Sequence, residues 1–377
     1  MNTPNLRFKE FIDSWSTKEM KEILSIGSGK DYKHLNKGDI PVYGTGGLMT
    51  MVDGYLFDGE TVCIGRKGTI DKPLYHKGRI WTVDTLFYTH SFTNVIPYFV
   101  YLLFQNVNWK QHNEAGGVPS LTKKTIELIK FNIPKIAEQQ KIADFFQNAD
   151  NRLNLLKNKK TLLEQYKKAV MQKIFSQELR FKDDNGGDYP KWKNDKLKAV
   201  TKIYDGTHQT PKYTEHGIPF YSVEHVTANN FSKTKFISEE VFTKENKRVK
   251  LEKGDILMTR IGDIGTSRLL DWDVKASFYV SLVLLKPCED IDSSYLNQFI
   301  KTPIFQGELW ERTIHVAFPK KINLGEIGEC LLHLPCLKEQ KKIARFLVSI
   351  EDKIKSLQQQ VENTEIWKKS LLQQMFV

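Results

Sequence analysis

The sequence predicts an α+β protein in which two α/β domains alternate with two long helices that pair as an antiparallel coiled coil. A helix-start motif occurs twice, as I-P-K-I-A-E-Q-Q-K-I-A from Ile133 and as L-P-C-L-K-E-Q-K-K-I-A from Leu334. A heptad pattern follows each copy, and a stretch long enough for a globular domain precedes it. Repetition on this scale indicates two equivalent units. We predict domains at residues 1–132 and 178–333 and long helices at residues 133–177 and 334–377.

Both long helices are predicted to begin at a proline. Pro134 and Pro335 suit a first helical position, because the N–H group that proline lacks has no intrahelical partner there. Glu138 and Glu339 follow in the first turn, where the helix dipole favours a negative charge. These features predict where each helix starts.

The heptad pattern predicts how the helices bury their apolar sides. The repeating positions are Ile142, Ala149, Leu156, Leu163 and Val170 in the first helix and Ile343, Ile350, Leu357, Thr364 and Leu371 in the second. Ile142 and Ile343 are 201 residues apart, as are Phe175 and Phe376, so both helices share one register. Pairing the two helices is the simplest way to bury such a seam. An antiparallel pair would hold the domains at opposite ends of a rod, related by an approximate twofold axis. The alternative is that each helix serves only the core of its own domain.

The two domains open with shared landmarks. Each begins with L-R-F-K, at Leu6–Lys9 and Leu179–Lys182, and the turn-rich segment Lys182–Pro190 is the predicted linker into the second domain. A short apolar strand then ends on an arginine that precedes a glycine loop, at Gly59–Arg66 and Gly254–Arg260. Short apolar runs between glycine and asparagine turns predict strand-rich α/β domains.

The domains also close alike. Aromatic segments at Val95–Phe104 and Tyr295–Ile300 are predicted helices. V-P-S-L-T-K-K at Val118–Lys124 and F-P-K-K-I at Phe318–Ile322 then precede the long helices.

The loops between these landmarks differ. Gly27–His34 in the first domain has a different sequence from Asp205–Tyr213 in the second. One scaffold with two sets of loops suggests two readers of different targets.

Composition favours a basic, soluble protein that binds nucleic acid. The 377 residues are 40% hydrophobic and carry a formal net charge of +11. Neutralising phosphates releases counterions and supplies affinity, although a basic surface also serves solubility. No apolar run reaches the roughly 20 residues of a membrane span. Cys63, Cys288, Cys330 and Cys336 show neither C-x-x-C spacing nor histidine partners at ligand spacing, so we expect reduced, buried thiols in a cytoplasmic protein.

Together these motifs resemble the DNA-specificity subunit of Type I restriction-modification systems. The resemblance covers essentially the whole chain, and its most specific part is the P-x-x-x-E-Q-x-K-I-A helix start, which is present twice. D-G-T-H-Q-T-P-K-Y at Asp205–Tyr213 and G-D-I-L-M-T-R-I-G at Gly254–Gly262 look like patterns of its target-recognition domains. The first domain carries loops of another class, G-S-G-K-D-Y-K-H and Y-G-T-G-G.

The resemblance implies a recognition protein without catalysis of its own. Each domain would read one half of a bipartite, asymmetric site in double-stranded DNA, and the helix pair would set the spacer. The helices would dock two modification subunits, which carry S-adenosylmethionine and methylate adenine. Whether two motor-nuclease restriction subunits join them is left open. The chain itself would hold no cofactor or metal.

The sequence contains no motif that argues for an enzyme. We find no N-P-P-Y motif, no Walker A loop and no nuclease carboxylate cluster. Tyr43–Gly47 is glycine-rich but lacks the strand and helix that frame a nucleotide-binding loop. We interpret it as a loop that approaches DNA, with a plain surface turn as the alternative.

Candidate DNA contacts lie in the loops. Arg66 and Arg260 each stand between a strand and a glycine loop, where a rigid arginine could read guanine, and a structural role is the alternative for both. Lysines suit phosphates, with ordinary solvated surface as the alternative. The predicted set is Tyr43, Thr45, Gly46, Arg66, Lys67, Lys72, Lys123 and Lys124 in the first domain and Thr207, His208, Lys212, Tyr213, Arg260, Lys320 and Lys321 in the second.

Polar residues near the helix starts are candidates for docking the modification subunits, with an ordinary solvated helix face as the alternative. They are Gln139, Gln140 and Lys141 in the first helix and Gln340, Lys341 and Lys342 in the second.

Two other functions remain open at this stage. A coiled-coil nucleic-acid-binding scaffold, such as an RNA binder, would not discriminate between duplex sequences. A free-standing DNA-modifying enzyme would need catalytic motifs that this sequence lacks.

Overall fold

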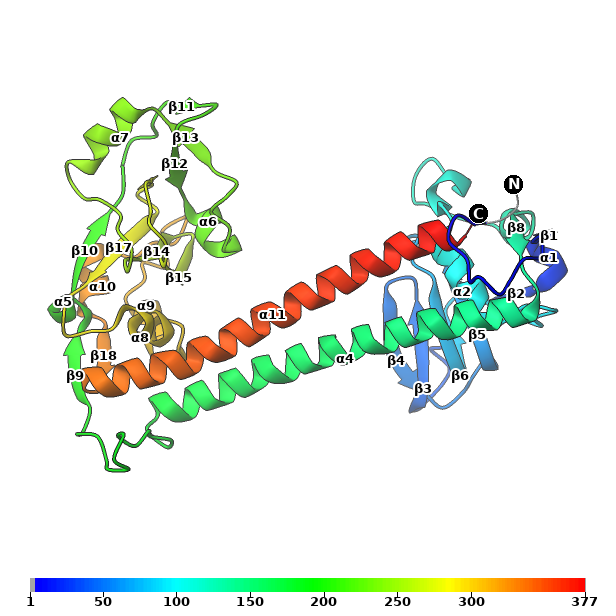
Figure 1. The fold of residues 1–377 in the computed structure, drawn as a ribbon, viewed down its shortest axis with the longest axis horizontal. Coiled ribbons are helices and arrows are strands. Elements are labelled where there is room, and N and C mark those ends of the chain that lie inside the picture. The colour runs from blue at the N-terminus through cyan, green and yellow to red at the C-terminus, as the bar shows by residue number, and fades with distance from the viewer. Residues whose placement is uncertain (1–3, 377) are drawn as a thin grey trace. The chain divides into compact units, whose positions relative to one another are not determined.

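The computed structural model describes residues 4–376 as two compact units of mixed α/β structure (Figure 1). Unit 1 comprises residues 4–158 and 358–376, and unit 2 comprises residues 159–357. The division falls inside two long helices, α4 (Ile136–Phe175) and α11 (Leu337–Met375), so each unit contains part of both. No helix within the described residues is long and apolar enough to cross a membrane.

Unit 1 is built on one six-stranded sheet. Its elements before α4 are β1 (Ser16–Glu19), α1 (Met20–Ile23), β2 (Ser25–Ser28), β3 (Lys37–Gly44), β4 (Gly47–Val52), β5 (Phe57–Gly65), β6 (Leu74–Thr82), β7 (Leu86–His90), α2 (Pro97–Asn106), the 3-10 helix η1 (Trp109–His112), α3 (Lys123–Glu127) and β8 (Lys130–Ile133). The strand order in the sheet is β2-β7-β5-β6-β3-β4, and β1 pairs separately with β8.

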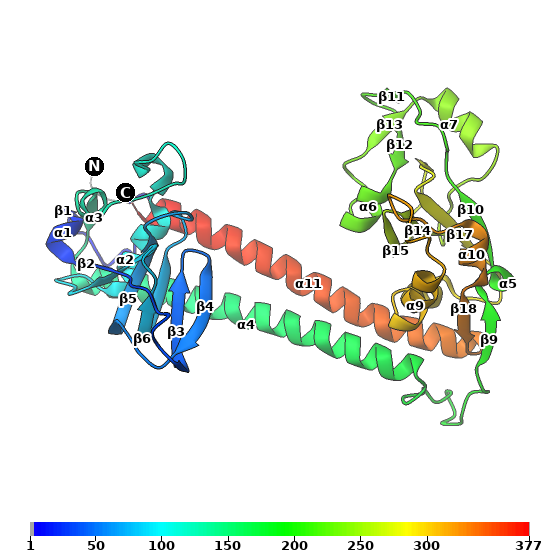
Figure 2. The same cartoon turned by 180° about the vertical axis from the view of Figure 1, so that it is seen from behind.

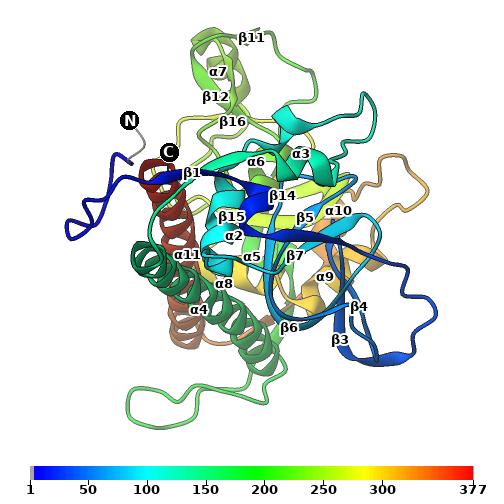
Figure 3. The same ribbon diagram turned by 90° about the vertical axis from the view of Figure 1, so that its right-hand side faces the viewer.

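Helix α2 joins the sheet of unit 1 to the long helices. It starts at Pro97, which suits a first helical position, and it packs on β5 and β6 (Figure 3). The fully buried Phe99 shares one core with Ile64 of β5 and Phe146 of α4. Leu6 lies beside the end of α11, because its N–H donates to the Gln374 carbonyl at 3.0 Å.

Unit 2 contains two four-stranded sheets (Figure 2). Its elements are β9 (Lys193–Lys196), α5 (Leu197–Val200), β10 (Thr201–Asp205), β11 (Tyr213–Thr214), β12 (Ile218–Tyr221), α6 (Val223–Ala228), β13 (Lys235–Ile237), α7 (Glu239–Asn246), β14 (Ile256–Ile261), β15 (Asp263–Leu269), β16 (Ser277–Phe278), β17 (Leu282–Pro287), α8 (Ser293–Ile300), α9 (Pro303–Glu311), α10 (Leu324–Glu329) and β18 (Leu331–Leu334). The strand orders are β10-β17-β14-β15 and β11-β13-β12-β16, and β18 pairs separately with β9.

The two units share a skeleton, as the sequence landmarks predicted. The order β2-β7-β5-β6 in unit 1 matches β10-β17-β14-β15 in unit 2, and the β1-β8 pair matches β9-β18. The predicted aromatic helices are present as α2 and α8.

Within each unit the segments of α4 and α11 are antiparallel. In unit 1 Asp150 pairs with Lys368 at 2.5 Å and Lys157 with Glu365 at 2.6 Å, so residue numbers fall along α11 as they rise along α4. In unit 2 Lys167 pairs with Glu351 at 2.5 Å. Flanking ion pairs beside an apolar seam are typical of coiled coils.

The apolar seam is buried unevenly. Ile142 and Ile343 are fully buried in the domain cores, whereas Leu156 and Leu163 are only half-buried. The helices therefore serve the cores of the units as well as each other. Both also begin two residues after the predicted proline, at Ile136 and Leu337.

The expectation that all four cysteines are buried was wrong for Cys336, which is only half-buried, and for Cys288. This residue is exposed because it follows β17, where the chain leaves the sheet. Cys63 and Cys330 are buried, and burial raises the pKa of each thiol to about 12. Those two thiols therefore have little thiolate character.

Candidate nucleic-acid interface

Three strand ends of unit 1 meet at one edge of its sheet. Ser28, at the end of β2, pairs with Phe87 near the start of β7. Gly65, at the end of β5, pairs with Leu86 in the same strand. Because these pairs are antiparallel, the loops that leave β2 and β5 project from the same edge.

The turn between β3 and β4 projects from this edge as well. Strand β3 runs parallel to β6, with Tyr43 opposite Thr82, and the Val83 N–H donates to the Tyr43 carbonyl at 3.0 Å. Thr45 and Gly46 form the turn that follows. Thr45 lies near the loop after β5, since a Cβ atom on Gly68 would be 3.5 Å from Thr45 Oγ1.

A segment from the end of the domain crosses the same edge. The Gly68 N–H donates to the Pro119 carbonyl at 2.8 Å. The Leu121 N–H donates to the Arg66 carbonyl at 2.9 Å. Gly68 has a φ of 95°, which side chains rarely adopt, so the loop requires glycine there. The Arg-x-Gly loop and the V-P-S-L-T-K-K motif thus form one structural element.

Unit 2 repeats this arrangement with different side chains. The Gly262 N–H donates to the Lys320 carbonyl at 2.8 Å, and the φ of Gly262 is 81°. The Ile322 N–H donates to the Arg260 carbonyl at 3.1 Å. The F-P-K-K-I motif therefore lies beside the Arg260 loop, as V-P-S-L-T-K-K lies beside Arg66.

The loops after β2 and β10 are held at equivalent glycines. The Lys30 N–H donates to the Thr82 carbonyl at 2.8 Å, and the Thr207 N–H donates to the Phe278 carbonyl at 2.9 Å. A Cβ atom on Gly29 would lie 1.9 Å from the Val83 carbonyl oxygen. A Cβ atom on Gly206 would lie 2.2 Å from the Phe278 oxygen. Only glycine fits either crossing, so loops of different sequence leave the two sheets at the same point.

Arg66 and Lys67 lie where the sequence predicted them. Both are exposed immediately after β5. Arg66 Nη1 donates to the Asp84 carbonyl at 3.3 Å, and its guanidinium lies 6.0 Å from the centre of the Phe87 ring. These contacts orient the side chain at the sheet edge while leaving it accessible.

The remaining predicted residues of unit 1 are less closely grouped. Tyr43 is half-buried and packs against His76, with ring centres 5.7 Å apart. Lys72 and Lys124 are exposed and Lys123 is half-buried. Among the described residues, no side-chain hydrogen bond or ion pair joins these three lysines to the Arg66 loop.

The prediction that Arg260 stands at the surface was wrong. Only 8% of the residue is exposed, and burial lowers the pKa of its guanidinium. Nε donates to the Val280 carbonyl at 2.9 Å, and Nη1 donates to the Ile322 carbonyl at 3.1 Å. Nε and Nη1 thus bind the backbone of neighbouring segments, and Nη2 lies 3.9 Å from Asp205 Oδ2. This is the structural role that stood as the alternative.

The structure also corrects the prediction of Thr207 as a DNA contact. It is buried, and its hydroxyl donates to Glu245 Oε2 at 2.7 Å. His208 is exposed, with Nε2 2.7 Å from Asp205 Oδ2. Asp205 also pairs with Arg248, a half-exposed cation that the sequence did not single out.

Tyr213 belongs to the second sheet of unit 2, and Lys212 immediately precedes its strand β11. Both are exposed, and Tyr213 in β11 packs against Phe220 of β12, with ring centres 5.9 Å apart. Burial raises the pKa of Tyr213. Lys235 Nζ lies 4.7 Å from the centre of the Tyr213 ring, which adds a second cation to this surface. Lys320 and Lys321, the predicted phosphate contacts, are exposed, and the backbone bond from Gly262 to Lys320 holds them beside the Arg260 loop.

A protruding loop in each unit was missed. In unit 2 it is closed where the Ile314 N–H donates to the Lys321 carbonyl at 2.8 Å. In unit 1 the Glu114 N–H donates to the Ser120 carbonyl at 3.1 Å. The only sequence signal was that both loops end in the Val118 and Phe318 motifs already identified.

Two of the predicted docking residues are buried instead of exposed. The Gln139 side chain accepts from the Ile96 N–H at 2.9 Å and donates to the Pro134 carbonyl at 2.9 Å. Gln340 makes the equivalent bonds to Asp292 and Pro335, at 2.8 and 3.0 Å. The start of α2 or α8 therefore covers each glutamine.

The other docking candidates remain accessible. Gln140, Lys141 and Lys341 are exposed, and Lys342 is half-buried. Lys141 lies 3.4 Å from Glu10, and Lys342 donates to the Lys182 carbonyl at 2.8 Å.

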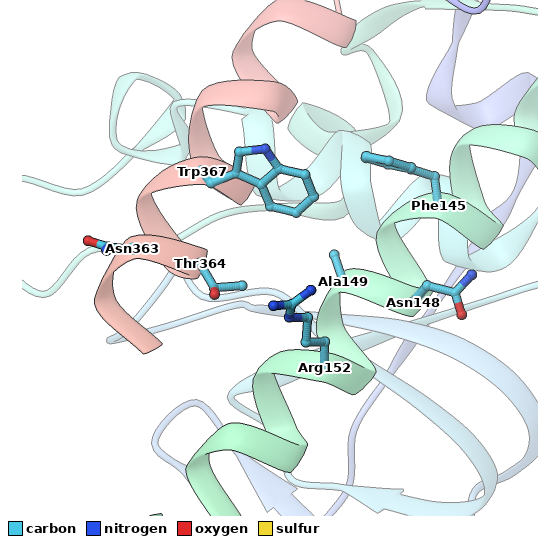
Figure 4. A pocket seen from close by; sticks show the side chains of 7 residues that line it. All are labelled: Phe145, Asn148, Ala149, Arg152, Asn363, Thr364 and Trp367. Carbon is cyan, nitrogen blue, oxygen red and sulfur yellow. The ribbon is translucent and has the colours of Figure 1, made fainter. Parts of the chain in front are cut away.

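A groove of about 470 Å³ lies between α4 and α11 in unit 1 (Figure 4). Phe145 and Trp367 face each other across it, with ring centres 5.8 Å apart. The lining residues are Phe145, Asn148, Ala149, Arg152, Asn363, Thr364 and Trp367. The accessible Trp367 ring beside the Arg152 cation is a surface that suits a protein partner.

Residues 4–376 contain no group of three or more His, Cys, Asp and Glu side chains arranged to hold a metal ion. The accessible polar groups at the sheet edges include cations and loop hydroxyls, which suit phosphates and base edges. They also include the carboxylates of Asp84 and Asp263.

Comparison with known proteins points to one family. The family described as Type I restriction modification DNA specificity domain matches residues 12–165 and 180–365. The MjaVIII specificity subunit of a Type I restriction enzyme from Methanocaldococcus jannaschii is 27% identical over 338 residues, which cover 84% of this chain and 76% of that protein. The EcoBI specificity subunit from Escherichia coli is 22% identical over 404 residues, covering 93% of this chain and 82% of that protein.

The fold also has a solved counterpart. The S subunit of a Type I restriction-modification system from M. genitalium superposes with a TM-score of 0.71 at 14% sequence identity. The match covers 100% of this chain and 99% of that chain. At this identity the likeness concerns the fold.

Proposed function

The chain belongs to the family of Type I restriction modification DNA specificity domains, and we propose that its two units each read one half of a bipartite, asymmetric site in double-stranded DNA. The observation that carries this proposal is the repeated sheet edge. Equivalent backbone hydrogen bonds hold the loops around Arg66 and Arg260, while the sequences of the loops differ. A fixed frame with variable loops suits two readers of unlike sequences.

Charge supports DNA as the partner. The chain has a formal net charge of +11. Arg66 and Lys67 are exposed at the edge in unit 1, and Lys320 and Lys321 in unit 2. Cations of this kind fix a protein on the phosphate backbone, and loop side chains then read the base edges.

The role of the chain is recognition rather than catalysis. Its relatives are named specificity subunits of Type I restriction enzymes. S-adenosylmethionine and the methylation of adenine then belong to the modification subunit, which this chain would direct to its site.

The long helices are the proposed ruler and docking surface. Because α4 and α11 each contribute to both units, their length would set the spacer between the two half-sites. Two modification subunits would bind along them, and Gln140, Lys141 and Lys341 are exposed for that contact. The Phe145–Trp367 groove offers an aromatic anchor point for the same partner.

A methylation map tests this proposal. The chain would be expressed with its neighbouring modification subunit in a host without adenine methylation, and N6-methyladenine would be mapped across the genome. We expect one gapped, asymmetric motif that requires both proteins. Methylation by this chain alone would contradict the non-catalytic role. A stable complex on DNA without sequence preference would support the scaffold function.

A further inference from the structure

The 314–321 loop of unit 2 is held firmly at its base. The Ile314 N–H donates to the Lys321 carbonyl at 2.8 Å, and the next residue, Ile322, is bonded to the Arg260 loop. Near the tip, His315 Nε2 lies 2.9 Å from the Trp310 carbonyl oxygen. The loop therefore stands out from the sheet edge with its base fixed by the strands and its tip braced by α9.

The tip of this loop exposes apolar side chains. Val316 and Phe318 are almost completely exposed, and the accessible ring of Trp310 packs on His315 of the same loop, with ring centres 4.2 Å apart. A single exposed apolar side chain is ordinary, but two of them on one loop, with an accessible tryptophan packed against the preceding residue, form an apolar patch. Such a patch gains stability when a partner covers it.

Charge identifies the kind of partner. Lys320 and Lys321 follow the apolar tip directly, and neither ammonium group has a carboxylate partner within residues 4–376. Lys320 Nζ lies instead 4.8 Å from the centre of the Trp310 ring. The core of a protein–protein interface is depleted of lysine, whereas a DNA contact combines cations for phosphates with apolar groups for base edges.

Unit 1 carries a different tip at the equivalent place. Its loop is closed by the bond from Glu114 to Ser120 and reads A-G-G-V-P at residues 115–119. The tip of unit 2 reads H-V-A-F-P at residues 315–319. The backbone hydrogen bond that closes the loop is thus present in both units. The side chains at the tip, which would contact a partner, differ between them.

We propose that the 314–321 loop enters a groove of the duplex and determines part of the half-site that unit 2 reads. This inference rests on the proposed recognition of DNA. Val316 and Phe318 contact apolar base edges such as the thymine methyl group. Lys320 and Lys321 bind the flanking phosphates.

The test compares Phe318→Ala with Ile304→Ala, a control in α9 that removes another exposed apolar side chain of unit 2. Each full-length variant is purified with its modification subunit. Fluorescence anisotropy then measures affinity for a duplex with the mapped target and for one with the target scrambled. Because one wrong base pair typically costs a specific complex about tenfold or more, we expect Phe318→Ala to lose about tenfold on the target. Binding to the scrambled duplex and the salt dependence should not change, and Ile304→Ala should match the wild type.

A methylation map of the Phe318→Ala variant gives a second readout. We expect relaxed sequence preference in one half of the motif and an unchanged other half. Since Phe318 is exposed, the melting temperature of the Phe318→Ala variant should equal that of the wild-type protein.

Three outcomes separate the possibilities. If the wild type discriminates the target and Phe318→Ala does so equally well, the loop does not read bases and this inference fails. If Phe318→Ala instead releases the modification subunit, the loop is a protein contact and the inference also fails. A wild-type complex that shows no sequence preference would overturn the proposed function itself.

Discussion

Arg7 and Glu138 form a two-point ion pair that ties the start of unit 1 to the first turn of α4. Arg7 Nε and Nη2 donate to the two carboxylate oxygens of Glu138, both at 2.7 Å. Unit 2 repeats the pair with Arg180 and Glu339, at 3.2 and 2.8 Å. The side chain of Glu138 is 2% exposed and that of Glu339 is 0% exposed. The repeated L-R-F-K and E-Q motifs are therefore two halves of one interaction.

Replacing Arg7 by Ala should destabilise unit 1. The variant leaves the buried Glu138 carboxylate without its cation, and breaking a buried pair in this way costs about 3 kcal/mol. Denaturant unfolding followed by circular dichroism measures the loss. Lys135→Ala is the matched control, because Lys135 pairs with Asp13 at the surface and such pairs contribute about 1 kcal/mol or less. Equal, small losses in both variants would show that the Arg7 pair is not important for stability.

The sequence predicted the repeat but could not predict this pair. Arg7 and Glu138 are 131 residues apart, whereas Arg180 and Glu339 are 159 apart. The difference arises from the domains between them, which share a skeleton and differ in their loops. The sequence separation between the arginine and the glutamate is therefore not the same in the two units. The pairing depends on the tertiary fold and could not be recognised from a fixed spacing.

Gln139→Ala should also lower stability. The substitution leaves the Ile96 N–H and the Pro134 carbonyl without their partner in a buried site. Unsatisfied buried groups cost about 1–3 kcal/mol each, so we expect a loss of about 2 kcal/mol. The exposed neighbour Gln140 is the control, and Gln140→Ala should change the free energy of unfolding by less than about 0.5 kcal/mol.

Binding of the modification subunit separates the two roles considered for Gln139. A docking residue would weaken the complex without altering the melting temperature of the free chain. We expect the opposite for Gln139→Ala, with a lower melting temperature and an intact complex at low temperature. A weaker complex at unchanged stability would restore the docking hypothesis.

Heptad periodicity explains what could and could not be predicted on the helices. It placed Ile142 and Ile343 correctly on the buried side. It also puts Gln139 seven residues before the buried Phe146 and Gln340 seven residues before the buried Leu347, on the apolar side of each helix. The burial of both glutamines therefore agrees with the periodicity, and the docking hypothesis ran against it. The periodicity could not show which groups would meet them. The starts of α2 and α8 cover these glutamines. The bonded pairs Ile96–Gln139 and Asp292–Gln340 are 43 and 48 residues apart in the sequence, so each glutamine meets a helix from much earlier in the chain.

Glu351 should make the stability of unit 2 sensitive to acid. Burial raises the pKa of its carboxyl, but Lys301 and Lys167 more than offset this and bring the pKa to about 2, below the ordinary 4.5. Folding therefore favours the ionised form. Its contribution is fully present above pH 4.5 and is lost as the pH falls towards about 2.

The Glu351→Gln variant checks this pH dependence. It should be less stable than the wild type at neutral pH, and the difference in melting temperature should shrink as the pH falls through this window. Glu365→Gln removes the same charge from an exposed pair with Lys157 and should show a much smaller dependence. A difference for Glu351→Gln that stays constant from neutral to acid pH would contradict the assignment.

Removing the Arg260 side chain and removing the Lys321 side chain should affect stability differently, although both residues lie at the same sheet edge. Arg260→Ala deletes two charged hydrogen bonds to the buried backbone, at Val280 and Ile322, and should cost about 2–3 kcal/mol of stability. Lys321→Ala removes an exposed ammonium group and should leave the melting temperature unchanged.

DNA binding separates these two residues further. Lys321→Ala should weaken binding to target and scrambled duplexes alike, because a phosphate contact carries no sequence information, and it should reduce the slope of affinity against salt by about 1. Arg260→Ala, assayed well below its melting temperature, should keep the wild-type salt slope, since its guanidinium faces backbone carbonyls rather than solvent. A loss of preference at one base pair with unchanged stability would instead mean that Arg260 leaves its buried site to read DNA. The Arg-x-Gly pattern alone could not distinguish these roles, because unit 1 exposes its arginine and unit 2 buries the equivalent one.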